Sequence, residues 1–397
     1  MKLIEYKQFG NIDEEKKLNK KKLAILGAII AGILIIVLLI VIYACSSKFR
    51  NFLDTYLLVK NVSESSAPYL SIENEDNLYM YAYHDYVTVL KNNELKIYNS
   101  SGKNVQTLKL NISSPIFETK GKYLVVAEKN QQKVYLIKDK KIVWENSVDG
   151  NISGVAVNEN GYVAIIVSGT TYKSVITTFD NNGAEVFKTF LASTMVTDVT
   201  ISSDNKFISF CELDISGALV ESRVKTISIE DAKQKPENAI VYSYQIPSNM
   251  IVANLEYHQK NELVCMTESR ILSLKNGKIE VIDEIDKSNI SFVGIRLSKC
   301  YFKIVENMNG INNQTSNIEI HNTNNKGAYS YSVNGIAKST YSKEGVIAVN
   351  LGNEVYFINE KGWLIKKFTS SQEIKDIVLA DNIAGLISKN KIIFVSL

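Results

Sequence analysis

The chain has 397 residues, with 45 Lys and Arg against 42 Asp and Glu, and a formal net charge of +3. Residues 1–50 hold nine of the basic and only four of the acidic residues, so the rest of the chain is close to neutral. This balance argues against a nucleic-acid-binding surface and against an acidic disordered chain. None of the four cysteines forms a C-x-x-C pair, so zinc and thioredoxin-type chemistry are not expected.

An uncharged apolar segment begins immediately after Lys20, Lys21 and Lys22. Fifteen of the residues from 23 to 42 are Leu, Ile or Val, and a bilayer core of about 30 Å requires about 20 helical residues. We predict a transmembrane helix over residues 23–45 that contacts the lipid bilayer. The lysine excess of residues 1–22 predicts a short cytoplasmic tail and places the rest of the chain outside the cytoplasm.

Two features of this segment suggest further modes of membrane association. Residues 42–45 resemble the lipobox of bacterial lipoproteins, so lipid attachment at Cys45 is the alternative to a spanning helix. The apolar run exceeds the roughly 7–15 residues of a cleaved signal, and Tyr43 is bulky for a lipobox. Small residues at helical spacing would also allow self-association in the membrane. These residues are Gly27, Ala28, Ala31 and Gly32.

The rest of the chain consists of short strand-like runs that repeat about every 42 residues. Runs of one class alternate in polarity, and we expect them to be partly exposed. They begin at Glu94, Lys133, Ser174, Arg223, Arg270, Asn317, Glu354 and Lys391. A continuous apolar run precedes each of them, as in residues 123–127, and is typical of a strand buried on both faces. Four strands per 40–45 residues make one propeller blade.

Residues 133–144 run from an aliphatic strand through a polar turn to Trp144. This pattern resembles the repeat of the quinoprotein-like superfamily of PQQ and WD40-like β-propellers. The overall build is similar to bacterial single-span membrane proteins with an external propeller. The resemblance implies an all-β, eight-bladed propeller over residues 76–397, or seven blades if one repeat is a decoration. Quinoprotein enzymes bind a redox quinone, but no matching set of residues is found here.

The last repeat starts near Ile374 and has room for only three strands before Leu397. Its outer strand must therefore come from elsewhere in the chain. Residues 46–75 form a juxtamembrane linker, and residues 69–72 within it are the expected donor. Pairing this segment with the last repeat would close the ring and remove an exposed sheet edge.

No residue set predicts a catalytic, cofactor-binding or metal site. His84 and His258 end the inner strands of blades one and five, on opposite sides of the ring, so they cannot share a metal; we expect polar turn residues. His321 is expected near the outside. The acidic run at residues 283–286 (Asp283, Glu284, Asp286) is expected to be a solvated loop rather than a cation site. The polar loops at 309–313 and 322–325 lack the EF-hand pattern.

Other clusters are expected to serve packing. Four tyrosines near the start of the propeller favour core packing over a carbohydrate platform: Tyr79, Tyr81, Tyr83 and Tyr86. Cys211, Cys265 and Cys300 are expected to be buried free thiols, because facing sheets stand about 10 Å apart and a disulfide requires Cα atoms within about 7 Å.

A ring scaffold without convergent reactive groups favours a non-enzymatic module that binds a protein or a cell-envelope component. The candidate contact loops are residues 212–221, 231–238 and 306–316. The alternative is an extracytoplasmic glycan hydrolase or lyase, which would require two carboxylates about 5–10 Å apart in the funnel. A third possibility is a fixed subunit of an envelope assembly complex. No cofactor and no nucleic-acid partner are expected.

Overall fold

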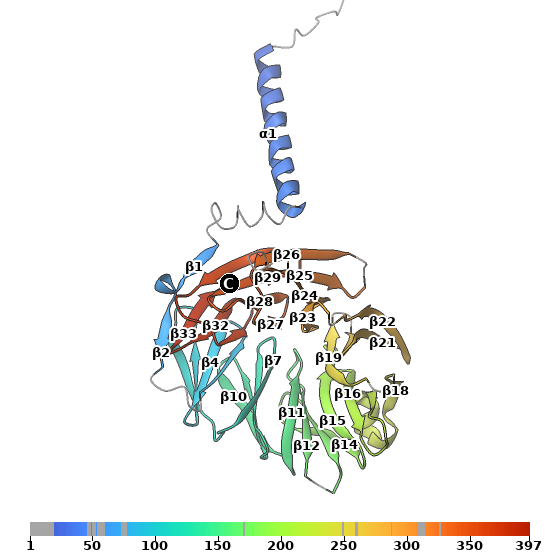
Figure 1. Cartoon of the computed structure of the whole chain (residues 1–397). Helices are drawn as coiled ribbons and strands as arrows, with labels where there is room; N and C mark the ends of the chain where they lie inside the picture. Colours follow the sequence, from blue (N-terminus) through green and yellow to red (C-terminus); the bar gives the residue numbers. More distant parts are fainter. Residues whose placement is uncertain are drawn as a thin grey trace, which may run out of the picture. The chain divides into compact units, whose positions relative to one another are not determined.

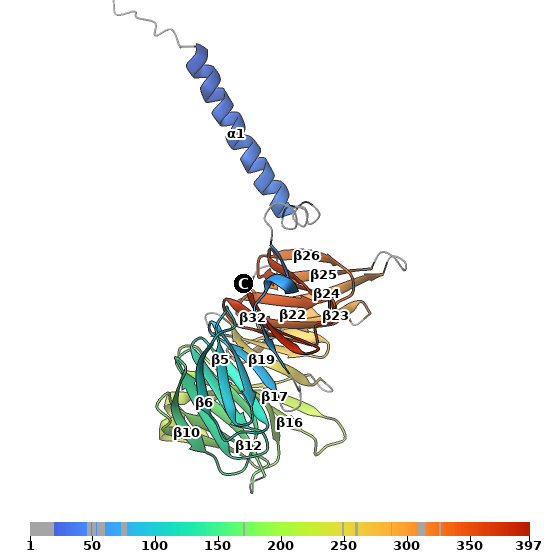
Figure 2. The same cartoon turned by 90° about the vertical axis from the view of Figure 1, so that its left-hand side faces the viewer.

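The computed structural model describes residues 20–45, 49, 53, 60–72, 78–169, 171–247, 250–258, 261–286, 288–308, 314–324 and 327–397 (Figures 1 and 2). The chain divides into two compact units, residues 1–58 and 59–397.

The first unit contains one long helix, α1 (Lys20–Cys45). Within it, Ala24–Tyr43 has a mean hydropathy of 3.5, and none of this stretch is buried against protein. A helix of 26 residues is about 39 Å long, enough for a bilayer core. Its large apolar side chains from Ile25 to Val41 are exposed. It is the one helix among the described residues that is long and apolar enough to cross a membrane, and a signal sequence would share these properties.

The second unit is an eight-bladed β-propeller, because its strands form eight separate sheets. The alternative of seven blades is therefore wrong. Blade one is β3 (Tyr79–Tyr83), β4 (Tyr86–Lys91), β5 (Glu94–Tyr98) and β6 (Asn104–Lys109). Blade two is β7 (Pro115–Lys120), β8 (Tyr123–Glu128), β9 (Lys133–Lys138) and β10 (Lys141–Ser147). Blade three is β11 (Asn151–Val157), β12 (Val163–Ser168), β13 (Ser174–Phe179) and β14 (Glu185–Leu191). Blade four is β15 (Met195–Ile201), β16 (Phe207–Asp214), β17 (Glu221–Ser228) and β18 (Ile240–Gln245).

The remaining blades repeat this antiparallel order. Blade five is β19 (Val252–His258), β20 (Glu262–Thr267), β21 (Arg270–Lys275) and β22 (Lys278–Glu284). Blade six is β23 (Ile290–Gly294), β24 (Cys300–Met308), β25 (Gln314–Asn322) and β26 (Ala328–Asn334). Blade seven is β27 (Ser339–Lys343), β28 (Val346–Asn350), β29 (Glu354–Asn359) and β30 (Leu364–Thr369). Blade eight contains β31 (Asp376–Leu379), β32 (Ile383–Ser388) and β33 (Lys391–Ser396).

Two strands that precede blade one close the ring. β2 (Tyr69–Ser71) pairs antiparallel with β33 and is the fourth strand of blade eight, at the position that the sequence analysis assigned to residues 69–72. β1 (Asn61–Ser63) pairs in parallel with β30 and adds a fifth strand to blade seven. The 3-10 turn η1 (Glu64–Ser66) connects β1 and β2. The sequence analysis missed β1, because three residues are too few to show a strand pattern.

The third strands are more buried than the sequence predicts. β13 is buried at every position, and the four central residues of β9, β21, β29 and β33 are all buried. The expectation of a less buried strand is therefore wrong for blades two, three, five, seven and eight. The reason is that adjacent blades pack face to face, so both faces of a middle strand contact apolar neighbours.

A tryptophan contact shows how neighbouring blades pack. Trp144 of β10 lies against Gly183, in the turn between β13 and β14 of the next blade. Gly183 has a φ of +84°, and a Cβ added to it would lie 2.8 Å from Trp144 Cγ. Asn146 Nδ2 donates a hydrogen bond of 2.9 Å to the carbonyl oxygen of Gly183. The Trp that carries the resemblance to the quinoprotein-like repeat is thus an inter-blade contact.

The insertion at residues 231–238 is helical rather than an open loop. It contains α3 (Ile229–Gln234) and the 3-10 turn η2 (Pro236–Asn238). Ser228 caps α3 by accepting a hydrogen bond from the backbone N–H of Asp231. Ile229, Ala232 and Ala239 are buried in the core between blades three and four. The sequence analysis missed this helix, since a single apolar face on six residues gives too weak a helical pattern, and its role as a contact segment stays a prediction.

Candidate functional site

A cavity of about 500 Å³ lies in the middle of the ring. Residues from the inner strand, or from the turn after it, line this cavity in seven of the eight blades. Figure 1 shows β7, β11, β15, β19, β23 and β27 around the middle of the ring. An inner strand pairs with a neighbour on one edge only, so the backbone groups on its other edge need other hydrogen-bond partners. Charged side chains in the cavity can serve as such partners.

Blade two contributes two ion pairs that cross the cavity. Glu118 Oε2 lies 3.2 Å from Arg296 Nη1, and the Lys120 ammonium lies 3.0 Å from Glu256 Oε1. The charge of Glu118 raises the pKa of Arg296. Burial opposes ionisation of Glu256, but the charges of Lys120 and Arg296 outweigh it and lower the pKa of Glu256. These four side chains therefore form two compensated ion pairs.

Two further charged residues of the lining lack such a partner. Among the described residues, no oppositely charged side chain lies within 4 Å of Asp198 or Lys343. Asp198 accepts hydrogen bonds from the backbone N–H groups of Val199 (2.9 Å) and Leu255 (2.8 Å). Lys343 Nζ donates to the carbonyl oxygen of Ala82 at 3.3 Å. Burial raises the pKa of Asp198 to about 6 and lowers the pKa of Lys343 to about 8.

His258 is a buried cavity residue and not the turn residue that the sequence analysis expected. It ends β19, is 3% exposed, and its Nε2 lies 2.7 Å from the carbonyl oxygen of Ile295. A carbonyl oxygen only accepts, so Nε2 must carry the proton. Burial lowers the pKa of His258, so the ring is neutral and Nδ1 is a bare acceptor. Nδ1 is buried and has no hydrogen-bond partner in the described part of the chain.

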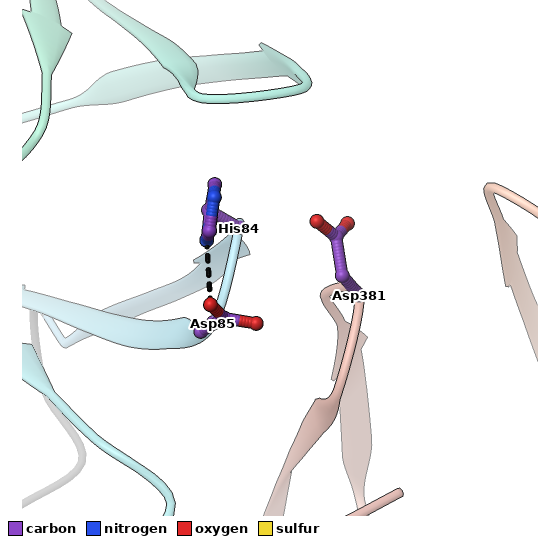
Figure 3. A group of neighbouring side chains, drawn as sticks. All are labelled: His84, Asp85 and Asp381. Carbon is purple, nitrogen blue, oxygen red and sulfur yellow. Dashed lines mark ion pairs between the residues drawn. The ribbon is translucent and has the colours of Figure 1, made fainter.

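His84 lies in the turn between β3 and β4, with a φ of +50°, as the sequence analysis expected. Its Nδ1 is 2.8 Å from Asp85 Oδ2, and Asp381 of the turn after β31 lies opposite (Figure 3). One ligand atom from each of the three lies within 4.8 Å of the others, which is close enough for a metal ion. Burial and the nearby charge of Glu344 raise the pKa of Asp381 to about 6. All three side chains are partly or largely exposed, and exposed acidic groups commonly cluster without an ion.

The other charged candidates are engaged within the protein. His321, on β25, stacks on Tyr301 with ring centroids 5.1 Å apart. In the acidic run at the end of β22, Asp283 pairs with Lys303 at 2.7 Å, and Glu284 lies 3.3 Å from Arg270. The side chain of Asp286 accepts a hydrogen bond from the backbone N–H of Ser288.

The tyrosine cluster packs inside the propeller. Tyr83 is fully buried, and Tyr79, Tyr81 and Tyr86 pack against the same core. Tyr81 also lines the cavity and stacks on Phe117 with ring centroids 5.1 Å apart.

Cys211, Cys265 and Cys300 are buried free thiols, which confirms the prediction. Burial raises the pKa of Cys211 and of Cys300 to about 11, so both remain protonated. The side chain of Cys45 lies outside the described residues.

The loop candidate at residues 212–221 is shorter than predicted, because β16 extends to Asp214. Glu212 is 2% exposed, and its carboxylate lies 2.7 Å from Lys225 Nζ. Ile215 and Leu219 are more than half exposed in the remaining loop. In the loop candidate at 306–316, β24 extends to Met308 and β25 begins at Gln314. Residues 309–313 between them lie outside the described residues. Asn325, in the polar loop at 322–325, also lies outside them.

Exposed apolar side chains also occur on the neighbouring blade three. Tyr172 and Phe190 stack with ring centroids 4.7 Å apart, and Ser174 Oγ accepts the backbone N–H of Val196 at 3.0 Å, which joins blades three and four here. We call this surface the apolar rim. It consists of Tyr172, Phe190, Met195, Ile215 and Leu219, all at least 40% exposed.

The sequence model of a protein family of unknown function, DUF5711, matches residues 60–397. The chain belongs to this family. A comparison with curated proteins finds no match. Among solved structures, the DUF5711 chain is similar to the Dos1 propeller, with a TM-score of 0.54 and 9% identity over 83% of this chain and 95% of that one.

Two further propellers are similar in structure. The first is Chaetomium thermophilum Sqt1 bound to the N-terminus of ribosomal protein L10, with a TM-score of 0.52 and 12% identity over 83% of this chain and 99% of that one. The second is BamB from Moraxella catarrhalis, with a TM-score of 0.45 and 9% identity over 83% of this chain and all of that one. At these identities the comparisons show the shared propeller fold of the DUF5711 chain.

Proposed function

We propose that this DUF5711 protein is a membrane-anchored, extracytoplasmic and non-enzymatic module whose propeller binds another protein or a cell-envelope component. α1 supports the anchor, since its exposed apolar surface requires a bilayer or an equivalent environment. The excess of lysines before α1 supports an external propeller. The small residues Gly27 and Gly32 have no neighbouring atoms within 4 Å, which leaves that part of α1 open for self-association.

The apolar rim is the observation that carries the binding proposal. Isolated apolar side chains are common on protein surfaces, but here a stacked aromatic pair and three further exposed apolar residues, Met195, Ile215 and Leu219, come from blades three and four. Charged groups border it, since Arg223 pairs with Glu221 at 2.8 Å at the start of β17. An apolar centre with a polar border is the arrangement of protein-binding surfaces, in which aromatic residues contribute most of the affinity.

The Sqt1 structure supports this reading at the level of the fold, because that propeller is bound to a polypeptide, the N-terminus of ribosomal protein L10. A rigid ring with variable loops presents such surfaces without changing its core. The partner of this chain would be identified by what binds to the apolar rim.

The alternative, a glycan hydrolase or lyase, requires two free carboxylates in the funnel. The cavity contains Glu118, Asp198 and Glu256, but Glu118 and Glu256 are each ion-paired with a basic side chain. Among the described lining residues, Asp198, Glu159 and Glu344 have no basic partner within 4 Å, but Glu159 and Glu344 lie in exposed turns. Asp198 is thus the single unpaired acid of the lining that lies on an inner strand, which is short of the acid and nucleophile pair, so we favour binding.

The proposal is tested by placing a photo-crosslinking amino acid at Leu219 in the full-length chain within intact membranes. The matched control places it at Val281, an exposed apolar position on the outer strand of blade five. We expect an adduct from Leu219 and not from Val281, and we expect Phe190→Asp to abolish it. Equal labelling at both positions, or none at Leu219, would contradict the proposal.

Orientation is tested separately by adding protease to intact protoplasts. The propeller should be digested while the tail of residues 1–22 is spared. Protection of the propeller would reverse the orientation and remove the extracytoplasmic part of the proposal, while leaving the binding test intact.

A further inference from the structure

Not all of the charged side chains that line the central cavity form ion pairs. The lining contains five acidic and three basic residues. Two acidic residues, Glu159 and Glu344, lie in exposed turns at the mouth, after β11 and β27. Within the cavity, the pairs Glu118 with Arg296 and Lys120 with Glu256 neutralise each other. One charge of each sign is left, on Asp198 and on Lys343.

Both remaining groups have unused hydrogen-bonding capacity. The Asp198 carboxylate accepts two backbone N–H groups, and a carboxylate offers about four lone-pair sites. The Lys343 ammonium donates one hydrogen bond, to Ala82, out of the three that it has. Enclosed charges without an opposite charge are costly, which is why the pKa values of both groups are displaced toward the neutral form.

Arg296 is a third charged residue of the lining with spare hydrogen-bond donors. Its charge lowers the pKa of Asp198 and also lowers the pKa of Lys343. Its side chain is nearly half exposed, and the residue lines the cavity. Arg296 makes one hydrogen bond, to Glu118, among the described residues. A guanidinium has five N–H donors in a planar fork that suits a carboxylate.

His258 adds an unpartnered, buried acceptor to the cavity lining. The residue is 3% exposed, it lines the cavity, and its bare Nδ1 acceptor has no donor in the described part of the chain. Buried acceptors are normally satisfied, because an unmade hydrogen bond costs about 1–3 kcal/mol. An N–H donor on a bound molecule would satisfy it.

We propose that the central cavity binds a small zwitterion of the amino acid or short peptide class, with its carboxylate on Lys343 and Arg296 and its ammonium group on Asp198. A backbone N–H of the same molecule would meet Nδ1 of His258. The volume of about 500 Å³ is within the usual range of about 300–1,000 Å³ for small-ligand pockets. This site is distinct from the apolar rim, and it adds a small-molecule ligand to the proposed binding module.

The test is isothermal titration calorimetry on the full-length protein in detergent, with three probes. Alanyl-alanine carries both charges, N-acetylalanine carries only the carboxylate, and alaninamide carries only the amine. We expect alanyl-alanine to bind and each single-charge probe to bind at least tenfold more weakly. These three titrations use the unaltered chain, so they remain decisive if a variant fails to fold.

Two variants then assign the roles. Asp198→Asn should weaken alanyl-alanine binding at least tenfold, and Lys343→Met should do the same. The matched controls are Asp180→Asn, whose carboxylate accepts two backbone N–H groups in the turn after β13, and Lys338→Met, an exposed lysine paired with Glu373; both should leave affinity unchanged. No heat from alanyl-alanine at 10 mM, equal binding of the single-charge probes, or unchanged affinity in both site variants would overturn the proposal.

Discussion

The Lys391 ammonium lies 2.8 Å from the Glu64 carboxylate, and this contact joins the first residue of β33 to the turn η1 between β1 and β2. The other oxygen of Glu64 accepts hydrogen bonds from the hydroxyl groups of Ser370 (3.1 Å) and Ser371 (2.8 Å). One carboxylate thus ties together the closing segment, blade seven and blade eight. The contact is short and lies at the seam of the ring.

We expect Glu64→Gln to lower the free energy of unfolding by about 1–3 kcal/mol, the usual value of hydrogen bonds to a charged group. Thermal unfolding followed by circular dichroism measures the effect. The control is Glu185→Gln, which removes an exposed pair with Lys188 within one strand and should change stability by less than about 0.5 kcal/mol. Equal effects of the two substitutions would show that the seam contact does not stabilise the ring.

Acidification should weaken the contacts of the Glu64 carboxylate at this seam. The hydrogen bonds from Lys391 and Ser371 lower the pKa of Glu64 from 4.5 to about 2. A carboxylate whose pKa is lower in the folded state contributes stability that is full above the unfolded pKa and is lost as pH falls through the folded pKa. The contribution of Glu64 should therefore decline between about pH 4.5 and pH 2. Melting curves over this range should show a smaller pH dependence for Glu64→Gln than for the unaltered chain, and parallel curves would contradict the assignment.

The inter-blade contact of Trp144 predicts a position-specific cost at Gly183. In Gly183→Ala, the new Cβ would lie 2.8 Å from Trp144 Cγ and the residue would keep a φ of +84°. We expect a loss of about 2–4 kcal/mol, from backbone strain and from displacement of the ring. Gly121→Ala is the control, because Gly121 has a φ of +53° but no atom within 4 Å of the added Cβ. Gly121→Ala should lower the free energy of unfolding by only about 1 kcal/mol. If both variants lost the same stability in chemical denaturation, the contact with Trp144 would not be the cause of the loss at Gly183.

Lys343→Met should stabilise the protein at neutral pH. Burial lowers the pKa of Lys343 from 10.5 to about 8, so the charged form is disfavoured in the folded state. The unfolded chain then binds more protons between about pH 8 and pH 10.5, and stability rises with pH across that window. We expect a gain of about 1–2 kcal/mol for Lys343→Met at pH 7 that shrinks toward pH 10. Lys338→Met should show no such gain, and a loss of stability at pH 7 would contradict the cost assigned to the charge.

Replacing the buried Glu212 should strongly destabilise blade four. Its buried carboxylate is 2.7 Å from Lys225 Nζ and accepts a hydrogen bond of 3.0 Å from Thr194 Oγ1. Removing one partner of a buried ion pair typically costs about 3–5 kcal/mol. Because Lys225 is partly exposed, we expect about 2–4 kcal/mol for Glu212→Gln, measured by thermal unfolding. The double variant Glu212→Gln with Lys225→Met should recover part of this loss, and no recovery would show that the ion pair is not the cause.

The repeat was readable from the sequence because each blade has the same strand order and a turn at the same point. Eight runs spaced about 42 residues apart correspond to the third strands of the eight sheets, and the donor of the last outer strand was also placed near Tyr69. β1 and α3 were missed because three and six residues carry too little periodicity. The burial of third strands was underestimated, since their second face is covered by another blade and not by their own sheet.

The central cavity was not predicted, because its residues are distant in sequence and come from one strand in each blade. Glu118, Asp198, Glu256 and Arg296 are spread over almost 180 residues, and no local spacing links them. One signal was present: inner strands are otherwise rich in apolar or small residues, so a charge within one is unexpected.

The order of strands along the chain gives the closed ring one further property. β2 is synthesised before all eight blades, whereas its partner β33 is synthesised after the other seven are complete. A chain released early would leave β2 without a partner and blade eight with an open edge, and such edges recruit other strands. Translation must therefore reach Lys391 before β2 and β33 can pair. Formation of this strand pair thus requires that all eight blades have been synthesised.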